Sequence, residues 1–412
     1  MSGSDNHHSE GHHAEEPYED NIILDGEASR LSQRALIVGG VALAAAVAVG
    51  FSDLPKLQRA YLVAFMYVLS AGLGALWFVT IQHLTNAKWS VVVRRVAEIL
   101  ASNMLLVGVL SLGVVIPMLL GSTDLYVWLD HERVHNDHIL HHKAAYLNIT
   151  FFTVRWLLYF AFWIWLGRRF FKMSVKQDKD GGSEITSALQ RTSAPAMIVF
   201  ALTLTFCSFD LVMSLDATWF STMFGVYYFA GCVLAGYSTL ALALMWVQSN
   251  GRLNATVTKE HYHDIGKMMF AFTVFWAYIG FSQFMLIWYA DIPEETHWYH
   301  WRFEGGWKVV SAMLLVCHFV MPFFGLMSRH VKRNKKTLAF WALWILAIHY
   351  VDLFWLIYPN GDGGVPLGLV DVLCLVGVVS LFIGVSARRA RGVNLVPTGD
   401  PRLADSLAFE NV

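Results

Sequence analysis

The chain has 412 residues and a formal net charge of −1; 56% of its residues are hydrophobic, 14% aromatic and only 15% charged. Soluble domains contain about a quarter charged residues, so this composition excludes the pair of soluble domains that the length alone would allow. Apolar runs of about 17–25 residues recur instead, each long enough to cross a bilayer. A transmembrane β-barrel would need short alternating segments, so the sequence predicts an all-α integral membrane protein.

Residues 1–30 are polar, acidic and rich in histidine, with the runs HHSEGHH and AEEPYED. This composition is typical of a solvated tail. The histidines could bind a metal, but a solvated tail is the preferred interpretation. The first apolar run begins too far into the chain for a cleaved signal peptide, so we expect a cytoplasmic N-terminal tail.

Ten apolar segments follow the tail and are predicted to be transmembrane helices. Some are rich in small residues, and we expect Gly72 and Gly74 to be sites of close helix packing. The predicted spans are 35–51, 60–83, 96–120, 147–171, 195–215, 222–247, 265–289, 307–327, 338–358 and 366–386.

Basic residues concentrate in the loops after the even-numbered spans. Lys88, Arg94 and Arg95 follow the second span, and Arg168 and Arg169 lie at the end of the fourth. Cytoplasmic loops carry an excess of Lys and Arg, so we expect both termini to be cytoplasmic and residues 391–412 to form a second cytoplasmic tail.

Two loops on the opposite side are long and rich in aromatic residues and histidine. The first contains HERVHNDHILHH and the second DIPEETHWYHWRF. Histidines three and four residues apart can bind a metal from one helical face, but a surface that contacts an outer partner is the preferred interpretation. The histidines of the first loop are His131, His135, His138, His141 and His142.

Ionisable residues inside the spans gather in the half that faces the outer side. Chains of Asp, Glu and His within a membrane mark proton or ion paths. The alternative is a structural network, for instance an Arg155–Asp210 pair that holds the helices together. The candidates for a proton path are Asp210, Asp216, Arg155, His349, Asp352 and Asp371 on the outer side, His318 near the middle and Glu98 near the inner rim.

The sequence does not predict a cofactor bound by this chain. The cysteines Cys207, Cys232, Cys317 and Cys374 lie singly in apolar segments, without the spacing of haem c or iron–sulfur ligands. His318 and His349 are the intramembrane histidines that could ligate haem b, but they lie at different depths. No metal site or soluble-type catalytic motif is predicted.

Three segments resemble the ActF-type subunit of bacterial alternative complex III, a quinol:cytochrome c or quinol:acceptor oxidoreductase. They are FVTIQHLTNAKWSVVVRRVAE at 78–98, SLDATWFSTMFGVYYFAG at 214–231 and FSQFMLIWYADIPEETHWYHWR at 281–302. Such subunits are similar to the membrane anchors of the NrfD/polysulfide-reductase superfamily. The resemblance therefore implies a bacterial inner-membrane protein of a respiratory or photosynthetic electron-transport chain.

The resemblance also implies an architecture and partners. A first transmembrane helix within 31–56 would precede four-helix bundles at 57–217 and 218–360, formed by spans two to five and six to nine. A tenth helix within 361–390 would follow them. The implied partners are a second NrfD-like subunit, an iron–sulfur subunit and c-type cytochrome subunits, which would hold the iron–sulfur clusters and haems of a complex that oxidises menaquinol or a similar quinol. No nucleic-acid partner is expected.

The function implied for this chain is that of a scaffold and a proton half-channel coupled to quinol oxidation. It is not expected to be catalytic by itself. Two alternatives remain open at this stage, an independent ion-coupled transporter and a subunit that itself binds the quinone.

Overall fold

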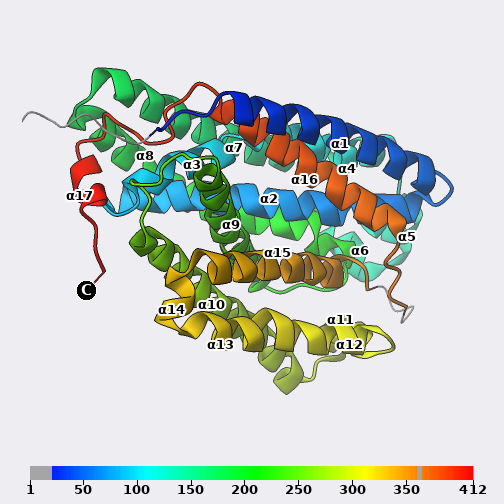
Figure 1. Ribbon diagram of the computed structural model, residues 1–412. Coiled ribbons are helices and arrows are strands. Elements are labelled where there is room, and N and C mark those ends of the chain that lie inside the picture. The colour runs from blue at the N-terminus through cyan, green and yellow to red at the C-terminus, as the bar shows by residue number, and fades with distance from the viewer. Residues whose placement is uncertain (1–20, 360–363, 412) are drawn as a thin grey trace, which may run out of the picture.

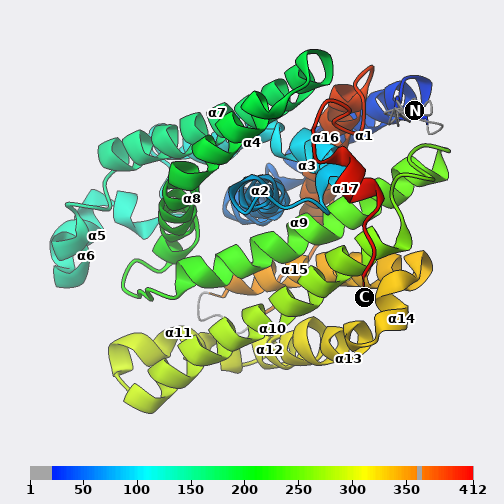
Figure 2. The same cartoon turned by 90° about the vertical axis from the view of Figure 1, so that its left-hand side faces the viewer.

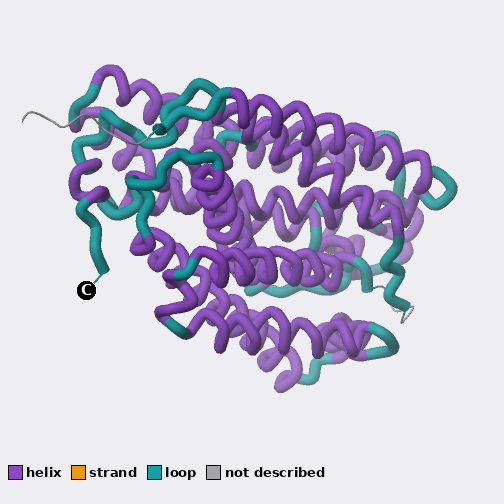
Figure 3. Tube along the Cα trace, in the orientation of Figure 1, coloured by secondary structure: helices purple, strands orange, loops and turns teal. Residues whose placement is uncertain are grey.

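The computed structural model describes residues 21–359 and 364–411. Figure 1 and Figure 3 show an array of long helices joined by short loops; within the described residues, β-structure is confined to isolated bridges near the termini. Ten helical segments are long and apolar enough to cross a membrane, which confirms the predicted all-α, multi-span architecture. The N-terminal histidine runs lie outside the described residues.

The spans are continuous helices in eight cases and are divided in two. The continuous ones are α1 (Gly26–Gly50), α2 (Leu54–Leu84), α7 (Ile149–Asp180), α8 (Ser183–Leu211), α9 (Phe224–Ser249), α10 (Lys259–Ala290), α15 (Lys335–Ile357) and α16 (Leu369–Ala390). The third span divides into α3 (Val91–Ala101) and α4 (Met104–Leu119), and the eighth into α12 (Trp307–Met313), a π-helical turn η3 (Leu314–Val320) and α13 (Met321–Met327).

Short elements lie at the two ends of the array. One end carries η1 (Val127–Leu129), α5 (His131–Asn136), α6 (His138–Lys143), the 3₁₀ turn η2 (Met213–Leu215) and α11 (Pro293–Phe303). The other carries α14 (Arg329–Arg333) and α17 (Leu403–Leu407), together with the start of α1 and the end of α16. Following the orientation expected from the loop charges, we refer to these as the outer and the inner end.

Several predicted boundaries are wrong because polar residues continue the helices beyond their apolar parts. The N-terminal tail ends earlier than predicted, since α1 already begins at Gly26. Pro195 does not begin the fifth span; it lies inside α8, which starts at Ser183. Arg94 and Arg95 do not lie in a loop but within α3, where both are fully buried.

The helix α2 is the centre of the array. In Figure 2 it is seen end-on with the other spans around it, and most of its apolar stretch is buried. Its closest partner is α9, where Gly74 and Gly236 face each other. A Cβ on Gly74 would lie 1.9 Å from the carbonyl oxygen of Cys232, so only glycine allows the two backbones to approach this closely.

The first and last spans pack along each other, with α16 lying between α1 and α2. Isolated bridges join Ile23 to Asn394 and Leu24 to Arg391. The predicted C-terminal tail thus returns over the inner end of the array, and α17 contacts α3.

Candidate functional site

Buried polar side chains form separate groups at three depths. The outer pair joins α7 to α8, a central cluster lies between α2, α9, α10, η3 and α15, and an inner network surrounds α3. We define the central cluster as Ser70, Tyr227, Trp276, His318, His349 and Asp352.

The outer pair consists of Arg155 and Asp210. Nε and Nη2 of Arg155 each donate to one oxygen of Asp210 at 2.8 Å, and the hydroxyl of Tyr159 donates to the same carboxylate at 2.8 Å. The guanidinium also lies over the ring of Tyr146, 3.8 Å from its centroid. Both charges are therefore fully partnered, as expected of a structural ion pair.

Asp352 in the central cluster has different partners. It is 1% exposed, and its carboxylate accepts hydrogen bonds from the Tyr227 hydroxyl at 2.5 Å and the Trp276 indole at 3.3 Å. No Lys or Arg of the described residues pairs with it. A carboxyl held by neutral donors inside a membrane is typical of a group that binds and releases a proton.

His349 lies one turn before Asp352 on α15. Its Nε2 is 2.9 Å from the Ser70 hydroxyl, and its Nδ1 is 3.9 Å from Oδ2 of Asp352. That second distance exceeds hydrogen-bond length, and Nδ1 has no hydrogen-bond partner. One nitrogen of His349 is thus free and close to the carboxylate.

His318 completes the central cluster from the π-helical turn η3. Its ring stacks on Trp276, with the centroids 4.1 Å apart, and its centroid is 6.3 Å from that of His349. Both ring nitrogens are buried without a hydrogen-bond partner. A π-turn inserts one residue into the helix and is frequent at functional sites, and here it carries a histidine at the middle of its span.

Two further candidates lie apart from this cluster. Asp371 accepts from the Tyr358 hydroxyl at 2.5 Å and from the Gly368 backbone N–H at 2.9 Å. It therefore caps the first turn of α16. Asp216 folds the connection between α8 and α9 by accepting from the backbone N–H and hydroxyl of Thr218.

The connection between α8 and α9 is held by both outer loops. Oδ2 of Asp216 lies 2.8 Å from Nε2 of His297 on α11, and Lys143 of α6 donates to the Ala217 carbonyl at 2.7 Å. Burial lowers the pKa of Lys143, while Asp216 acts in the opposite direction. Trp219 stacks on Trp298, with centroids 4.4 Å apart. The residues 216–219 are therefore fixed between α6 and α11.

Glu98 belongs to the inner network. Nε of Arg94 and Nε of Arg95 lie 3.3 and 3.2 Å from its two oxygens, and Nε2 of His83 lies 3.8 Å away. Arg94 also pairs with Asp400 at 2.5 Å. The remaining members are Asp178, which pairs with Arg95, and Arg402, which pairs with Asp400.

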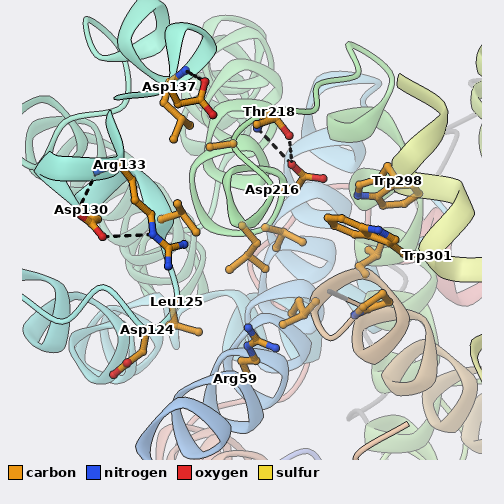
Figure 4. A pocket seen from close by; sticks show the side chains of 18 of the residues that line it. Arg59, Asp124, Leu125, Asp130, Arg133, Asp137, Asp216, Thr218, Trp298 and Trp301 are labelled. Atoms are coloured by element: carbon orange, nitrogen blue, oxygen red, sulfur yellow. Dashed lines mark hydrogen bonds and ion pairs between the residues drawn. The ribbon is translucent and has the colours of Figure 1, made fainter. Parts of the chain in front are cut away.

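A cavity of about 840 Å³ opens at the outer end. Figure 4 shows Arg133 and Asp130 on one side, Asp216 and Thr218 above, and Trp298 and Trp301 on the other side. Leu356 lines the same cavity, four residues after Asp352 on α15. Asp352 therefore lies about one helical turn, or roughly 6 Å, below the lining of the cavity.

Arg302 lines the same cavity at the C-terminal end of α15. Its side chain is 2% exposed, stacks on Trp298, and donates to the carbonyls of Trp298, Trp355 and Leu356. Burial lowers the pKa of Arg302 to about 9, so the guanidinium remains protonated at neutral pH. It caps the C-terminal end of α15, where a positive charge is favourable.

The structure joins some of the predicted residues and separates others. Arg155 contacts Asp210, and His349 lies near Asp352 and His318. No hydrogen bond or ion pair within 21–359 and 364–411 joins the outer pair, the central cluster and the inner network. The partners that sequence reasoning missed are Ser70, Tyr159, Tyr227, Trp276, Asp178, Asp400 and Arg402, which carry no distinctive motif.

The histidines of the first outer loop do not converge. His138 and His142 stack with centroids 6.3 Å apart on α6, and the described part of the chain contains no group of three or more His, Cys, Asp or Glu side chains that could hold a metal ion. These histidines lie beside the outer cavity rather than at the central cluster.

Comparison with known proteins adds no family assignment. No model of a known protein family matches the chain, and no curated protein matches it significantly in sequence.

Proposed function

We propose that this chain is a membrane subunit of a quinol:electron-acceptor oxidoreductase of the alternative complex III type. In this proposal it binds no redox cofactor itself, while partner subunits of the NrfD-like, iron–sulfur and c-type cytochrome classes hold the clusters and haems. The chain acts as a scaffold and as a proton half-channel coupled to quinol oxidation in the bacterial inner membrane, with both termini cytoplasmic.

The observation that carries the half-channel is the central cluster. Asp352 is held by two neutral donors, and His349 and His318 present buried ring nitrogens without partners. Protons move between such groups directly or through water, and polar residues that cost energy in lipid are retained where they serve a path. The fully paired Arg155 and Asp210 do not fit that role, so we assign them to the scaffold.

The position of the cluster favours a half-channel that opens outward. Asp352 is one turn below the lining of the outer cavity. Towards the inner end, Ser70 and His83 are thirteen residues apart on α2, which is about 20 Å. Buried apolar residues such as Leu73 and Leu76, together with the Gly74–Gly236 contact, fill that interval. A proton from the central cluster would therefore leave through the outer cavity.

The helix packing supports the scaffold part of the proposal. The helices α2, α4, α7 and α8 pack as neighbours around one group, and α9, α10, α13 and α15 around a second. The two groups meet where α2 packs on α9, and α1 and α16 form a pair beside α2. This arrangement fits two four-helix bundles with two peripheral helices, as proposed from the sequence resemblance. The outer loops, fixed against residues 216–219, would then provide the surface for the partner subunits.

Two experiments test the proposal. The first is purification of the full chain from its native membranes in mild detergent, with absorption spectra and metal analysis. Haem- and iron-containing partners are expected to co-purify with it, and purification of the chain alone would contradict the subunit role.

The second experiment replaces Asp352 with Asn in the assembled complex reconstituted in vesicles. Asp371→Asn is the matched control, because Asp371 also accepts from a tyrosine hydroxyl at 2.5 Å but lies outside the central cluster. We expect D352N to reduce proton release per electron, or turnover itself, at least tenfold while D371N retains both. Unchanged proton release and turnover in D352N would leave only the scaffold.

An independent ion-coupled transporter is a second candidate, favoured by one observation. The third span is interrupted at Ser102 and Asn103, near its middle, and the eighth contains the turn η3. Discontinuous helices at mid-membrane are typical of transporter substrate sites. A transporter would be active as the purified single chain, so co-purification with haem and iron–sulfur subunits argues against it.

A further inference from the structure

A second cavity, of about 610 Å³, lies on the inner half of the membrane-spanning region, away from the outer cavity and adjoining the central cluster only at its deep end. Its walls are α1, α2, α3, α9, α15 and α16, and its lining is almost entirely apolar. We infer that this groove binds one acyl chain of an anionic phospholipid of the inner leaflet, with the headgroup held by cations at the inner end.

The length of the groove matches one leaflet. Along α16 it extends from Val379 to Ala390, which are eleven helical steps or about 16 Å apart. Half of a hydrocarbon core of about 30 Å is about 15 Å. At its deep end the groove stops at Tyr67, near mid-membrane, and at the inner end it reaches Leu24 and Leu395. An acyl chain entering from the inner surface would end at the same depth.

The charge at the inner mouth identifies the headgroup. Lys336 precedes the lining residue Leu343 by two turns of α15, and Arg391 directly follows Ala390, so both lie at the inner end of the groove. Arg34 lies one turn of α1 beyond Leu31, about 5 Å further from that end. All three cations are exposed, and no salt bridge engages them within the described residues. Basic pockets between transmembrane helices at the cytoplasmic surface bind anionic lipid headgroups.

Carboxylates at this mouth do not cancel the positive charge. Glu27 is paired with Arg252, whose Nε also donates to the Ile23 carbonyl. Asp25 is the other nearby carboxylate, facing Gly392. The three unpaired cations therefore exceed the single unpaired carboxylate, which favours an anionic headgroup over a zwitterionic one.

Other occupants fit the groove less well. A transmembrane helix of a partner would need a groove about 30 Å long to pack along its whole span, whereas this one extends only about 16 Å along α16. Residues 1–20 are too polar in sequence to fill an apolar groove. A quinone headgroup at the deep end would lie near Tyr67 and Thr239 but away from the three cations, which lie towards the inner end.

Occupation of the groove would also touch the central cluster. The Tyr67 ring lies between the groove and His349, with centroids 5.9 Å apart, and contacts Tyr350 edge-on. An acyl chain that packs against Tyr67 therefore supports the side chain that borders His349. The proposal of a lipid site depends only on the groove and the nearby cations, and not on the role of the central cluster.

The test is native mass spectrometry of the full-length chain in detergent, titrated with phosphatidylglycerol and, separately, with phosphatidylcholine. One set of variants removes the mouth charges, R34Q, K336Q and R391Q together; the other fills the groove, A243F and A347F. The matched controls are K172Q, an exposed cation on α7, and A201F, an exposed alanine on α8; neither residue lines the groove.

Phosphatidylglycerol is expected to bind at least tenfold more tightly than phosphatidylcholine. Both variant sets should weaken that binding at least tenfold, and both controls should retain it. Equal binding of the two lipids, or loss only on charge removal, would overturn the proposal. Two other results would also overturn it. If A347F released menaquinone from the chain while the charge variants had no effect on lipid binding, the groove would be a quinone site. If A347F changed the oligomeric state, the groove would be a contact with a second protein chain.

Discussion

Arg155 of α7 and Asp210 of α8 face each other inside the outer half of the array and share two hydrogen bonds of 2.8 Å. The pair closes the gap between two adjacent spans near the point where the chain turns from α8 towards α9. Because Tyr159 and the Tyr146 carbonyl satisfy further donors and acceptors of the same pair, removal of either charge leaves several groups without partners.

Breaking this pair should destabilise the protein strongly. We expect Asp210→Ala or Arg155→Ala to lower the free energy of unfolding by about 3–5 kcal/mol, because the remaining charge is buried and uncompensated. Replacing both residues with Leu should cost clearly less than the sum of the single changes. Thermal unfolding in detergent measures both effects; additive losses would show that the two residues act independently.

A single methyl group should disturb the central cluster. A Cβ on Gly231 would lie 2.7 Å from Cε1 of His349, so Gly231→Ala must displace the imidazole from Ser70. Alanine is favoured over glycine in a helix by about 1 kcal/mol, and Gly40→Ala, which meets no atom within 4 Å, should show that gain. We expect lower thermal stability for G231A and equal or higher stability for G40A. Equal changes in the thermal stability of the two variants would contradict the close contact between Gly231 of α9 and His349.

The docking of the C-terminal segment should be independent of pH in the neutral range. Burial alone would raise the pKa of Asp400, but hydrogen bonds and charges from Arg402 and Arg94 outweigh it and hold the pKa well below its usual range. The released segment would bind a proton near pH 4. Docking therefore gains its full stability above about pH 4 and loses it as the pH falls further.

Hydrogen exchange of residues 394–408 measures this docking. Protection, corrected for the intrinsic exchange rate, should be constant between pH 5 and 8, and D400N should lose protection across that whole range. A tenfold fall in wild-type protection between pH 8 and pH 5 would be incompatible with a carboxylate held by two arginines.

The orientation can be tested by cysteine labelling in intact cells. The native cysteines lie within the spans, and Cys207, Cys232 and Cys374 are buried. Glu132 on α5 and Lys179 at the end of α7 are both exposed and lie at opposite ends of the array. We expect E132C to react with a membrane-impermeant maleimide from outside, and K179C only after permeabilisation. The reverse pattern would invert the orientation predicted from the loop charges.

The number of spans could be predicted from the sequence because each span contains an apolar run of sufficient length. Their ends were less predictable, since helices such as α7 and α8 continue through charged residues beyond the membrane-length run. Arg94 and Arg95 show the limit most clearly. Two adjacent arginines before an apolar run indicate a loop, but Glu98, Asp178 and Asp400 satisfy them inside the fold.

The depth of the candidate residues was also predictable, but their lateral positions were not. Depth follows from the position along a span, which placed Arg155 and Asp210 at a similar level. Whether two side chains touch depends on how each helix is rotated about its axis and on which helices are neighbours. Both the rotation and the neighbours are determined by packing between segments that are distant in the sequence. The sequence therefore gave no indication that Tyr227 and Trp276 would bind Asp352, or that a π-turn would orient His318.

The inner network has a consequence for the order of assembly. Arg94, Arg95 and Glu98 belong to the third span, but Asp400 and Arg402 follow the tenth. During translation, all ten spans of the described chain are made before Arg94 can meet its carboxylate partner at position 400. The segment after α16 therefore completes the inner network last, and a protein truncated after Arg391 would keep all ten described spans and still leave Arg94 without that partner.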